Sequence, residues 1–244
     1  RDIMQTLGNA GYMKSSIEQT KSINGKKLSI TFNVDPKTRY YIRNVKREII
    51  DEGLRDIICG DDTINSLLHS DMPFDINTLS EERARILHKL RNEGYYKFNK
   101  EDIRFVADTL LNQWTVDVTL RIGLHLENGR SIPEAHQKYK IGDITYLSDI
   151  STSATHPDTL RKNGLPYLYN NKLRFRPNLL SSNTKLKKGE YFNDSHLRKT
   201  YSNFTRLSAV SFSNVYLEER ENTNTLDAFV IVNHAKPHSL GFDI

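Results

Sequence analysis

Histidine, cysteine and paired acidic residues are the side chains of this 244-residue chain best suited to catalysis or metal binding. The histidines stand at positions 69, 88, 125, 136, 156, 196, 234 and 238. They form no His-Glu-x-x-His helix motif, and the single cysteine, Cys59, cannot supply the cysteine pairs of a structural zinc site. Glu81 and Glu82 are adjacent on an expected helix and point apart, so we interpret them as part of a solvated face.

Other catalytic signatures are also missing from the sequence. There is no glycine-rich phosphate loop and no Gly-x-Ser-x-Gly elbow. We interpret His234 and His238 as an accidental pair, and Cys59 as a small buried hydrophobe whose function the sequence does not reveal. We therefore expect a protein that is not an enzyme, with no catalytic residue, no metal site and no cofactor.

Positive charge is concentrated in one segment, Thr159 to Arg206. It carries eleven Lys or Arg against Glu190 and Asp194, a net of +9, whereas the whole chain carries +5. The candidate basic surface comprises Arg174, Arg176, Lys185, Lys187 and Lys188. This surface predicts either contact with an anionic membrane or acidic partner, or simply a solvated face.

Aromatic residues interleave with these charges, which supports a rival hypothesis. A basic protein with exposed rings could bind nucleic acid by stacking bases on them. The rings concerned are Tyr167, Tyr169, Phe175, Tyr191 and Phe192. We favour this reading less, because Phe192 recurs at a repeated core position.

The stretch from Phe74 to Ile122 predicts the elements that organise the chain. Asp75, Asn77 and Thr78 can cap a helix start, with Glu81 placed as in a capping box. The apolar residues of this helix recur at helical spacing, namely Leu79, Ile86, Leu87 and Leu90, and the charged residues Glu81, Arg85, Lys89 and Arg91 should face water. Gly94 follows as a left-handed cap, and two β-rich runs come next, of which Thr115 to Ile122 alternates strictly between apolar and polar.

This unit of helix, tight turn, strand, hairpin and strand occurs three times along the chain. Leu7 to Tyr12 matches Leu90 to Tyr95, and Phe192 with Leu197 repeats the spacing of Phe74 with Leu79. Opening strands with the pattern Tyr-x-Ile-x-x-[Val/Ile] precede two copies, at Tyr40 and Tyr139. In the second copy we expect a strand at Tyr40–Ile50 and a short helix at Thr63–His69, which gives the order β-α-α-β-β.

The fold class predicted is therefore α+β, with tandem small β-α-α-β-β domains. Each should be a three-stranded mixed sheet covered on one face by two helices. The expected boundaries are 1–38 for the C-terminal part of one domain, 39–124 for a complete domain, 125–138 for a linker, and 139–235 for a second complete domain. We expect an insertion without regular periodicity at about 148–177. Because the chain starts inside an expected helix, we interpret it as a piece of a longer protein.

These positions resemble the polypeptide-transport-associated (POTRA) domain. The resemblance is carried by Tyr40, Ile42, Val45, Phe74, Leu79, Arg83, Leu90, Gly94, Tyr95 and the run Val116–Ile122. The phrase MPFDINTLSEERARILHKLRNEGYYKF looks like the helical half of such domains in outer-membrane surface-antigen proteins, the β-barrel assembly factors and their translocation-and-assembly relatives. Residues 236–244 resemble the lead into the first strand of a membrane barrel. The lost Gly-Tyr pair and the insertion in the last domain depart from the pattern.

The resemblance implies a non-enzymatic module on the periplasmic side of the outer membrane of a Gram-negative bacterium. Its main partners would be unfolded or extended outer-membrane polypeptides and its own C-terminal barrel. Accessory periplasmic proteins and an anionic membrane surface are further expected partners, and nucleic acid is a disfavoured one. Since the last strand of each unit alternates most regularly, we place it centrally, which leaves the preceding strand as an edge to which clients could add. The predicted client-binding residues are Ile103, Arg104, Phe105, Val106, Ala107 and Asp108 in one domain, and Asn214, Val215, Tyr216, Leu217 and Glu218 in the other.

Overall fold

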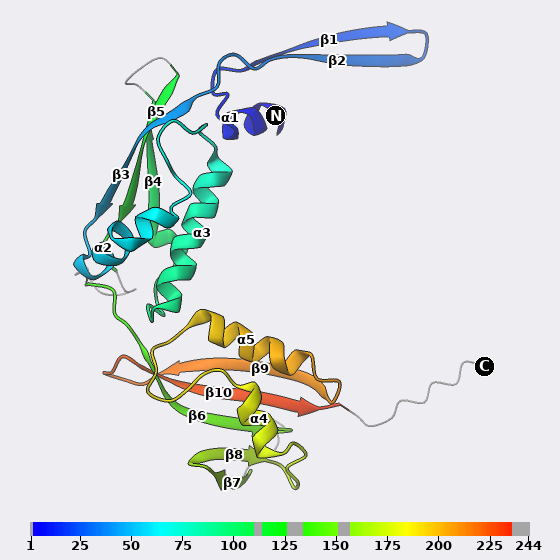
Figure 1. Cartoon of the computed structure of the whole chain (residues 1–244). Helices are drawn as coiled ribbons and strands as arrows, with labels where there is room; N and C mark the ends of the chain where they lie inside the picture. The colour runs from blue at the N-terminus through cyan, green and yellow to red at the C-terminus, as the bar shows by residue number, and fades with distance from the viewer. Residues whose placement is uncertain (1, 110–113, 126–133, 151–156, 236–244) are drawn as a thin grey trace. The chain divides into compact units, whose positions relative to one another are not determined.

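The computed structural model describes residues 2–109, 114–125, 134–150 and 157–235. The elements are α1 (Asp2–Asn9), β1 (Ser16–Asn24), β2 (Lys27–Asp35), β3 (Tyr41–Ile49), α2 (Glu52–Cys59), α3 (Ile76–Asn92), β4 (Ile103–Asp108), β5 (Thr115–Ile122), β6 (Lys140–Ser148), β7 (Asp158–Lys162), β8 (Leu165–Tyr169), α4 (Pro177–Asn183), α5 (Asp194–Thr205), β9 (Val210–Glu219) and β10 (Thr225–His234), with 3₁₀ helices at Asp61–Asn65 and Lys100–Asp102 (Figure 1). The expected lead into a barrel at 236–244, most of the expected linker and part of the insertion lie outside the described residues. Among the helices described, none is both long and apolar enough to cross a membrane.

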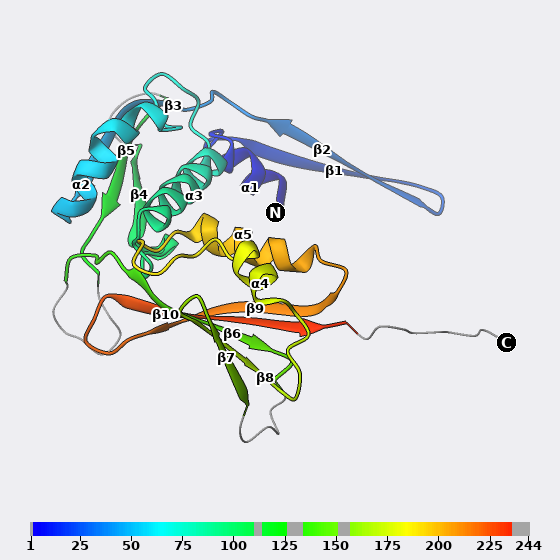
Figure 2. The ribbon, with the colours of Figure 1, turned by 60° about the horizontal axis from the view of Figure 1, so that its bottom comes forward.

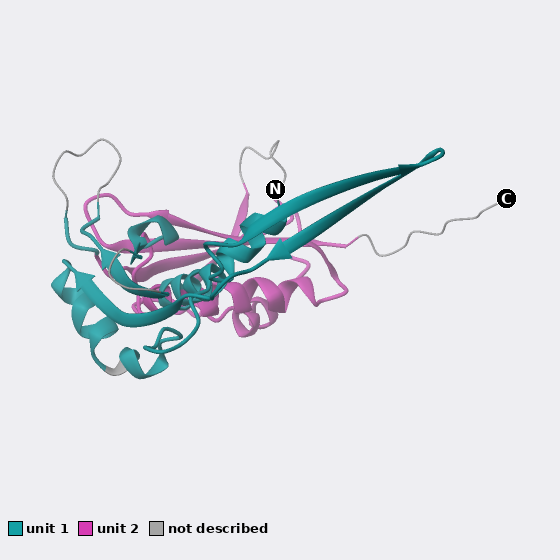
Figure 3. Ribbon diagram, turned by 90° about the horizontal axis from the view of Figure 1, so that it is seen from above, with its two compact units in different colours: residues 1–87, 98–136 teal, residues 88–97, 137–244 magenta. Residues whose placement is uncertain are grey.

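The chain divides into two compact units, shown in teal and magenta in Figure 3. Unit 1 comprises residues 1–87 and 98–136, and unit 2 comprises residues 88–97 and 137–244. The last turn of α3 therefore counts with unit 2. The predicted domain boundaries at 38/39 and 124/139 stay predictions.

Unit 1 contains the predicted three-stranded mixed sheet, in the order β3-β5-β4. β3 is parallel to β5, and β4 is antiparallel to it. The alternation of β5 explains its central place, because Val116, Val118, Leu120 and Ile122 are buried against the helices. α2 and α3 cover this one face (Figure 1), so the predicted two-layer α+β class is confirmed.

The first helix of unit 1 lies earlier than predicted. We expected a loop through Cys59 and a helix at Thr63–His69, but α2 spans Glu52–Cys59 and only a 3₁₀ helix follows. Asp51 caps α2 by accepting a hydrogen bond from the Leu54 N–H. Leu54 and Ile58, four residues apart, are the buried face. Cys59 at its end is exposed, which corrects the expectation of a buried thiol.

The charged residues of α3 are less solvated than the sequence suggested. The carboxylate of Asp75, rather than the Thr78–Glu81 pair, accepts from the first turn, at 2.7 Å from the Asn77 nitrogen. Glu82, interpreted as part of a solvated face, is 1% exposed and pairs with Arg85. Leu87 is only half-buried. The buried face of α3 therefore includes the ion pair of Glu82 with Arg85, because Ser66 and Leu67, outside the helix, donate hydrogen bonds to Glu82.

Unit 2 has a sheet of five strands, in the order β7-β8-β6-β10-β9. The predicted core of three, β6-β10-β9, has the same pairing as unit 1, but the insertion adds two more strands instead of an irregular loop. β8 runs parallel to β6, and β7 folds back on β8. Figure 2 shows α4 and α5 on one face of this sheet.

One backbone contact recurs in the two units and explains the Gly-Tyr turn. The Tyr40 N–H donates to the Gly11 carbonyl, and the Tyr139 N–H donates to the Gly94 carbonyl, both at 2.9 Å. Both glycines have positive φ, +88° and +109°. A Cβ at Gly11 would lie 2.5 Å from the Phe74 carbonyl oxygen, so neither turn accommodates a larger residue without strain.

The hairpin of β1 and β2 forms a sheet of its own. It pairs over its full length, and the two turn residues between the strands are Gly25 and Lys26. The dipeptide Asn24-Gly25 at this turn is typical of hairpins. Nearly all its side chains are exposed, including Phe32 at 52%. That it belongs to a partial domain stays a prediction.

Candidate functional site

β4 lies at the edge of the sheet in unit 1, where the sequence predicted an edge strand. Among the described strands it pairs only with β5. Its bounds, Ile103–Asp108, are those of the predicted client-binding strand. Its open side can therefore accept a further strand by geometry alone.

The hydrogen bonds of β5 decide which backbone groups of β4 point outward. The Ile50 N–H donates to the Ile122 carbonyl at 3.0 Å, so even-numbered residues of β5 direct their backbone groups toward β3. Alternate residues point to opposite sides, so odd-numbered residues of β5 are directed toward β4.

The register then assigns the groups on β4 itself. Val106 stands opposite the odd-numbered Thr119, so its N–H points inward to β5. Phe105 and Ala107, one position to either side, direct their N–H and C=O groups to the open edge. A probe of this edge therefore belongs at Ala107 rather than at Val106.

β9 is the corresponding edge of the sheet in unit 2, and it is longer, at ten residues. The Arg220 N–H donates to the Thr225 carbonyl at 2.9 Å, so these two residues form a hydrogen-bonded pair. Such pairs recur at every second residue, so the even-numbered residues of β9 direct their backbone groups to β10. Asn214 therefore points inward, whereas Val215 and Leu217 present their N–H groups outward. Of Val106 on β4 and Val215 on β9, only Val215 has an outward N–H.

The face of β9 turned away from the helices is aromatic. Phe212 is 52% exposed and Tyr216 is 42% exposed. Tyr216 stacks on Phe229 of β10 with ring centroids 4.8 Å apart. At the end of the strand, Glu219 accepts a hydrogen bond from the Tyr139 hydroxyl at 3.0 Å. The edge thus combines free backbone groups, two exposed rings and a charged terminus.

The remaining edges of the two mixed sheets, β3 in unit 1 and β7 in unit 2, are less open, whereas β1 and β2 each keep one edge unpaired among the described strands. The Ile42 N–H on β3 donates to the Met72 carbonyl at 2.8 Å, so a loop covers the start of that strand. In unit 2, the insertion covers the edge of β6 through β8. The last edge strand, β7, is five residues long with every side chain exposed, including Asp158, Arg161 and Lys162. Short charged edges of this kind resist strand addition.

The predicted basic surface is present but partly neutralised. It consists of Arg174, Arg176, Lys185, Lys187 and Lys188, of which all but the half-buried Lys185 are exposed. Lys187 pairs with Glu190 at 3.2 Å, and Lys188 pairs with Asp143. Arg174, Arg176 and Lys185 have no ion pair among the described residues, and the two arginines are the exposed members of these three.

Most of the aromatic rings that the nucleic-acid hypothesis needs for base stacking are not exposed. Three of the five rings lie in the core of unit 2, because Tyr167, Phe175 and Phe192 are at most 4% exposed. Tyr169 is half-buried, and Tyr191 alone is exposed, at 53%. Buried rings cannot stack on bases, so the structure disfavours this alternative.

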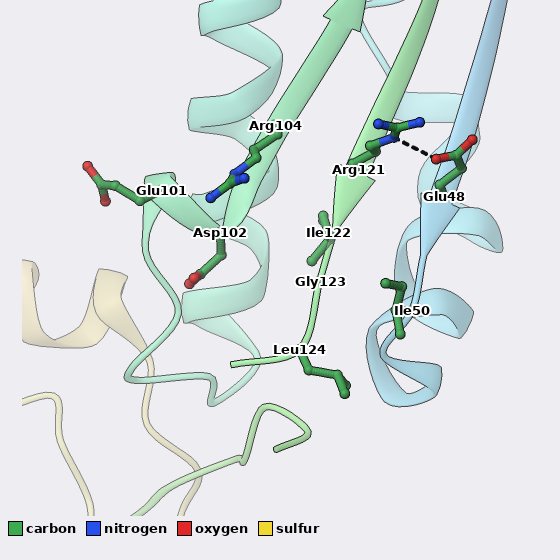
Figure 4. Close-up of a pocket in the computed structure, with 9 residues that line it drawn as sticks. All are labelled: Glu48, Ile50, Glu101, Asp102, Arg104, Arg121, Ile122, Gly123 and Leu124. Atoms are coloured by element: carbon green, nitrogen blue, oxygen red, sulfur yellow. Dashed lines mark hydrogen bonds and ion pairs between the residues drawn. The ribbon is translucent and has the colours of Figure 1, made fainter. Parts of the chain in front are cut away.

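A pocket of about 590 Å³ lies at the end of the sheet in unit 1 (Figure 4). Its lining residues are Glu48, Ile50, Glu101, Asp102, Arg104, Arg121, Ile122, Gly123 and Leu124. Two of these lining residues are joined by a hydrogen bond, which Glu48 accepts from Arg121 at 2.6 Å (Figure 4). The sequence did not predict this pocket, since its residues come from three strand ends with no common spacing.

Two β-α-α-β-β units with three-stranded mixed cores, each with helices on one face, define a POTRA type of fold. Neither a family model nor a curated protein matches the sequence. Solved structures do match. BamA POTRA domains 3–5 from Haemophilus influenzae align with 95% of this chain and 76% of that one, at 15% identity and a TM-score of 0.51.

A second solved structure, BamA from Haemophilus ducreyi lacking POTRA domains 1–3, aligns with 80% of this chain at 12% identity and a TM-score of 0.54. This chain covers 30% of that one. At such identities the likeness concerns the fold. The chain has the fold of tandem POTRA domains, as its sequence pattern predicted.

Proposed function

We propose that this chain is a periplasmic receptor and scaffold of an outer-membrane barrel protein that assembles or translocates polypeptides. In this proposal it holds extended clients by adding them as a strand to the edge of its sheets. The observation that carries the proposal is the open edge of β9, with the N–H groups of Val215 and Leu217 directed outward. The shared fold with BamA POTRA domains supports the cellular setting. No catalytic step is involved.

The chemistry of the edge suggests which clients it would hold. Main-chain hydrogen bonds recognise an extended conformation and tolerate varied sequence. Because a client strand alternates its side chains, every second one would lie beside Phe212 or Tyr216 on the open face. Clients with alternating apolar residues, as in the strands of membrane barrels, should therefore bind better than polar ones. Each backbone bond contributes a net of about 0.5–1.5 kcal/mol, so a short peptide should bind weakly.

Substituting proline at Val215 should weaken client binding while the fold survives. Proline removes the outward N–H and its ring obstructs a neighbouring strand, whereas no bond to β10 is lost. We expect the affinity for an extended peptide of alternating apolar residues to fall at least about threefold, since one net hydrogen bond is lost. Fluorescence anisotropy of a labelled peptide would measure this change, and circular dichroism would verify the fold.

The matched control is proline at Asn214, the next residue, whose N–H bonds to β10. That variant should be destabilised by about 1–3 kcal/mol, because the Ile231 carbonyl opposite it loses its donor, and this result would support the assignment of inward and outward groups. A folded Val215→Pro protein that binds the peptide as tightly as the parent would rule out the β9 edge as the client site.

Contact with an anionic membrane is a second, smaller part of the proposal, supported by the two unpaired arginines. Each cation near an anionic surface contributes about 1 kcal/mol, so replacing Arg174 and Arg176 with Glu should weaken binding to phosphatidylglycerol vesicles at least about tenfold at low salt. Vesicle co-sedimentation would measure this binding. Lys187→Glu is the comparison variant and should have a smaller effect, because Lys187 is already paired with Glu190. Equal binding of parent and double variant would contradict membrane contact.

A further inference from the structure

Three metal-ligating side chains converge in unit 1 beside the pocket at the end of the sheet. They are Asp102 at the end of the 3₁₀ helix before β4, His125 after β5, and His136 further along the chain. One ligand atom from each lies within 4.8 Å of the other two. None belongs to the proposed client-binding edge.

The tautomer of His136 is set by a buried carboxylate. The Nδ1 atom of His136 lies 2.9 Å from Oδ2 of Asp51, and the same oxygen accepts the backbone N–H of His136 at 2.7 Å. A carboxylate only accepts, so Nδ1 carries the proton and the Nε2 lone pair of the neutral ring is left available. A histidine held by a carboxylate through its other nitrogen is the usual arrangement behind a metal ligand.

Two imidazole nitrogens in this cluster are buried without a hydrogen-bond partner among the described residues. They are Nε2 of His136, whose side chain is 3% exposed, and Nδ1 of His125. The nearest acceptor to Nε2 is Oδ2 of Asp102, at 3.8 Å, beyond hydrogen-bond reach. Buried polar atoms are rarely unpaired, so these two atoms point to a missing ligand.

We propose that Asp102, His125 and His136 bind a divalent transition-metal ion of the Zn²⁺ class. Zinc binds imidazole nitrogen and carboxylate oxygen at about 2.0–2.2 Å in tetrahedral geometry, which separates two ligand atoms by about 3.4 Å. The 3.8 Å between Nε2 of His136 and Oδ2 of Asp102 is close to that value. Two imidazoles and one carboxylate favour Zn²⁺ over Ca²⁺ or Mg²⁺, which prefer oxygen ligands.

The surroundings suit such an ion. Phe98 lies edge-on to the His136 ring at 5.1 Å and provides an apolar wall. Asp102 also lines the pocket, so water can supply a fourth ligand from that side. His125 is held in place by paired backbone bonds with Glu134, both at 2.8 Å. The bound ion would join the turn before β4 to the segment after β5 and stabilise unit 1.

A metal-free arrangement is the competing explanation. Burial by itself would lower the pKa of His136, but the carboxylates of Asp102 and Asp51 outweigh it and raise that pKa above its usual 6.5. A protonated His136 between two carboxylates would account for its own Nε2 without a metal, but it would leave Nδ1 of His125 without a hydrogen-bond partner among the described residues. Protons and Zn²⁺ then compete for one nitrogen, so metal binding is best measured at mildly alkaline pH.

The test is a titration of the untagged, chelator-stripped chain with ZnCl₂ by calorimetry. We expect one equivalent to bind, and the melting temperature to rise with it. His125→Gln and Asp102→Asn should each weaken binding at least about tenfold. The matched controls His69→Gln and Glu101→Gln, both exposed and outside the cluster, should bind like the parent. Co²⁺ should give the intense visible bands of a tetrahedral site.

Two results would overturn the proposal. One is a folded parent chain that takes up no equivalent of Zn²⁺, which would favour the protonated His136. The other is a site whose affinity is the same in the parent, His125→Gln and Asp102→Asn proteins, which would place the metal elsewhere. Both variants change side chains without removing the anchor between His136 and Asp51, so loss of the fold should not obscure the result.

Discussion

Replacing Glu82 with alanine should lower the free energy of unfolding of unit 1 by about 3–5 kcal/mol. Glu82 is 1% exposed, and its carboxylate accepts hydrogen bonds from Arg85 at 2.7 and 3.0 Å. It also accepts from the Ser66 hydroxyl at 2.8 Å and the Leu67 N–H at 3.0 Å. Its removal deprives the Ser66 hydroxyl, the Leu67 N–H and the Arg85 guanidinium of this acceptor, which costs far more than the pair itself contributes.

Arg85 keeps one acidic partner when Glu82 is removed. Its guanidinium also donates to Asp62 at 2.8 Å, and Asp62 is 3% exposed. Without Glu82, the arginine stays tethered in the same place with one carboxylate instead of two. Urea denaturation followed by the fluorescence of Trp114, the single tryptophan of the chain, would measure the loss in unit 1.

The neighbouring Glu81 provides the matched control. It is exposed on the same helix, so Glu81→Ala should change the free energy of unfolding by less than about 0.5 kcal/mol. Similar effects of the two substitutions would mean that both carboxylates are solvated, as the sequence alone suggested.

The same carboxylate predicts a pH dependence. Burial by itself would raise the pKa of Glu82, but hydrogen bonds from Arg85, Leu67 and Ser66 outweigh it and hold the pKa below its ordinary 4.5. The unfolded chain therefore binds the proton more readily, so the stabilisation is complete above pH 4.5 and is lost as the pH falls through the folded value. Below pH 4.5 the parent should lose stability more steeply than Glu82→Gln.

Periodicity predicted the parts of the fold that depend on local pattern. The strict alternation of β5 placed it at the centre of its sheet, and that in turn placed β4 at the edge. Glu82 was misjudged for a physical reason. Residue type favours water for a glutamate, and its burial depends on Ser66 and Leu67, which lie next to α3 only in the tertiary fold.

The insertion was predicted at about 148–177, but as an irregular segment, and its hairpin of β7 and β8 was missed although a local signal existed. Asn163 and Gly164 have positive φ, +53° and +76°, and form the two-residue turn between β7 and β8. The dipeptide Asn163-Gly164 is the same hairpin signal as Asn24-Gly25. It was not recognised because its flanking strands are short and mix apolar with polar residues. The cluster of Asp102, His125 and His136 had no such signal, because its spacing matches no metal motif.

β8 contributes Tyr167 to the core of unit 2, so a large loss of stability should follow from Tyr167→Ala. Tyr167 is 2% exposed, and its ring stacks on Tyr146 of β6 with centroids 4.8 Å apart. β8 pairs with β6 at this position, so the ring closes the core between the two strands. Removing a buried aromatic ring costs about 3–5 kcal/mol, because the cavity collapses only in part.

Two matched variants separate the sources of this loss. Tyr167→Phe keeps the ring and gives up only a 3.4 Å hydrogen bond from the hydroxyl to the Pro177 carbonyl, so it should cost about 1 kcal/mol or less. Tyr169→Ala removes the same residue type from the same strand, but at a half-buried position, and should cost clearly less than Tyr167→Ala. Unit 2 has no tryptophan, so amide hydrogen exchange of β6, β9 and β10 would measure its stability. If exchange in these strands is unchanged in Tyr167→Ala, the hairpin is an independent addition, and the edge of β6 becomes a second candidate for client binding.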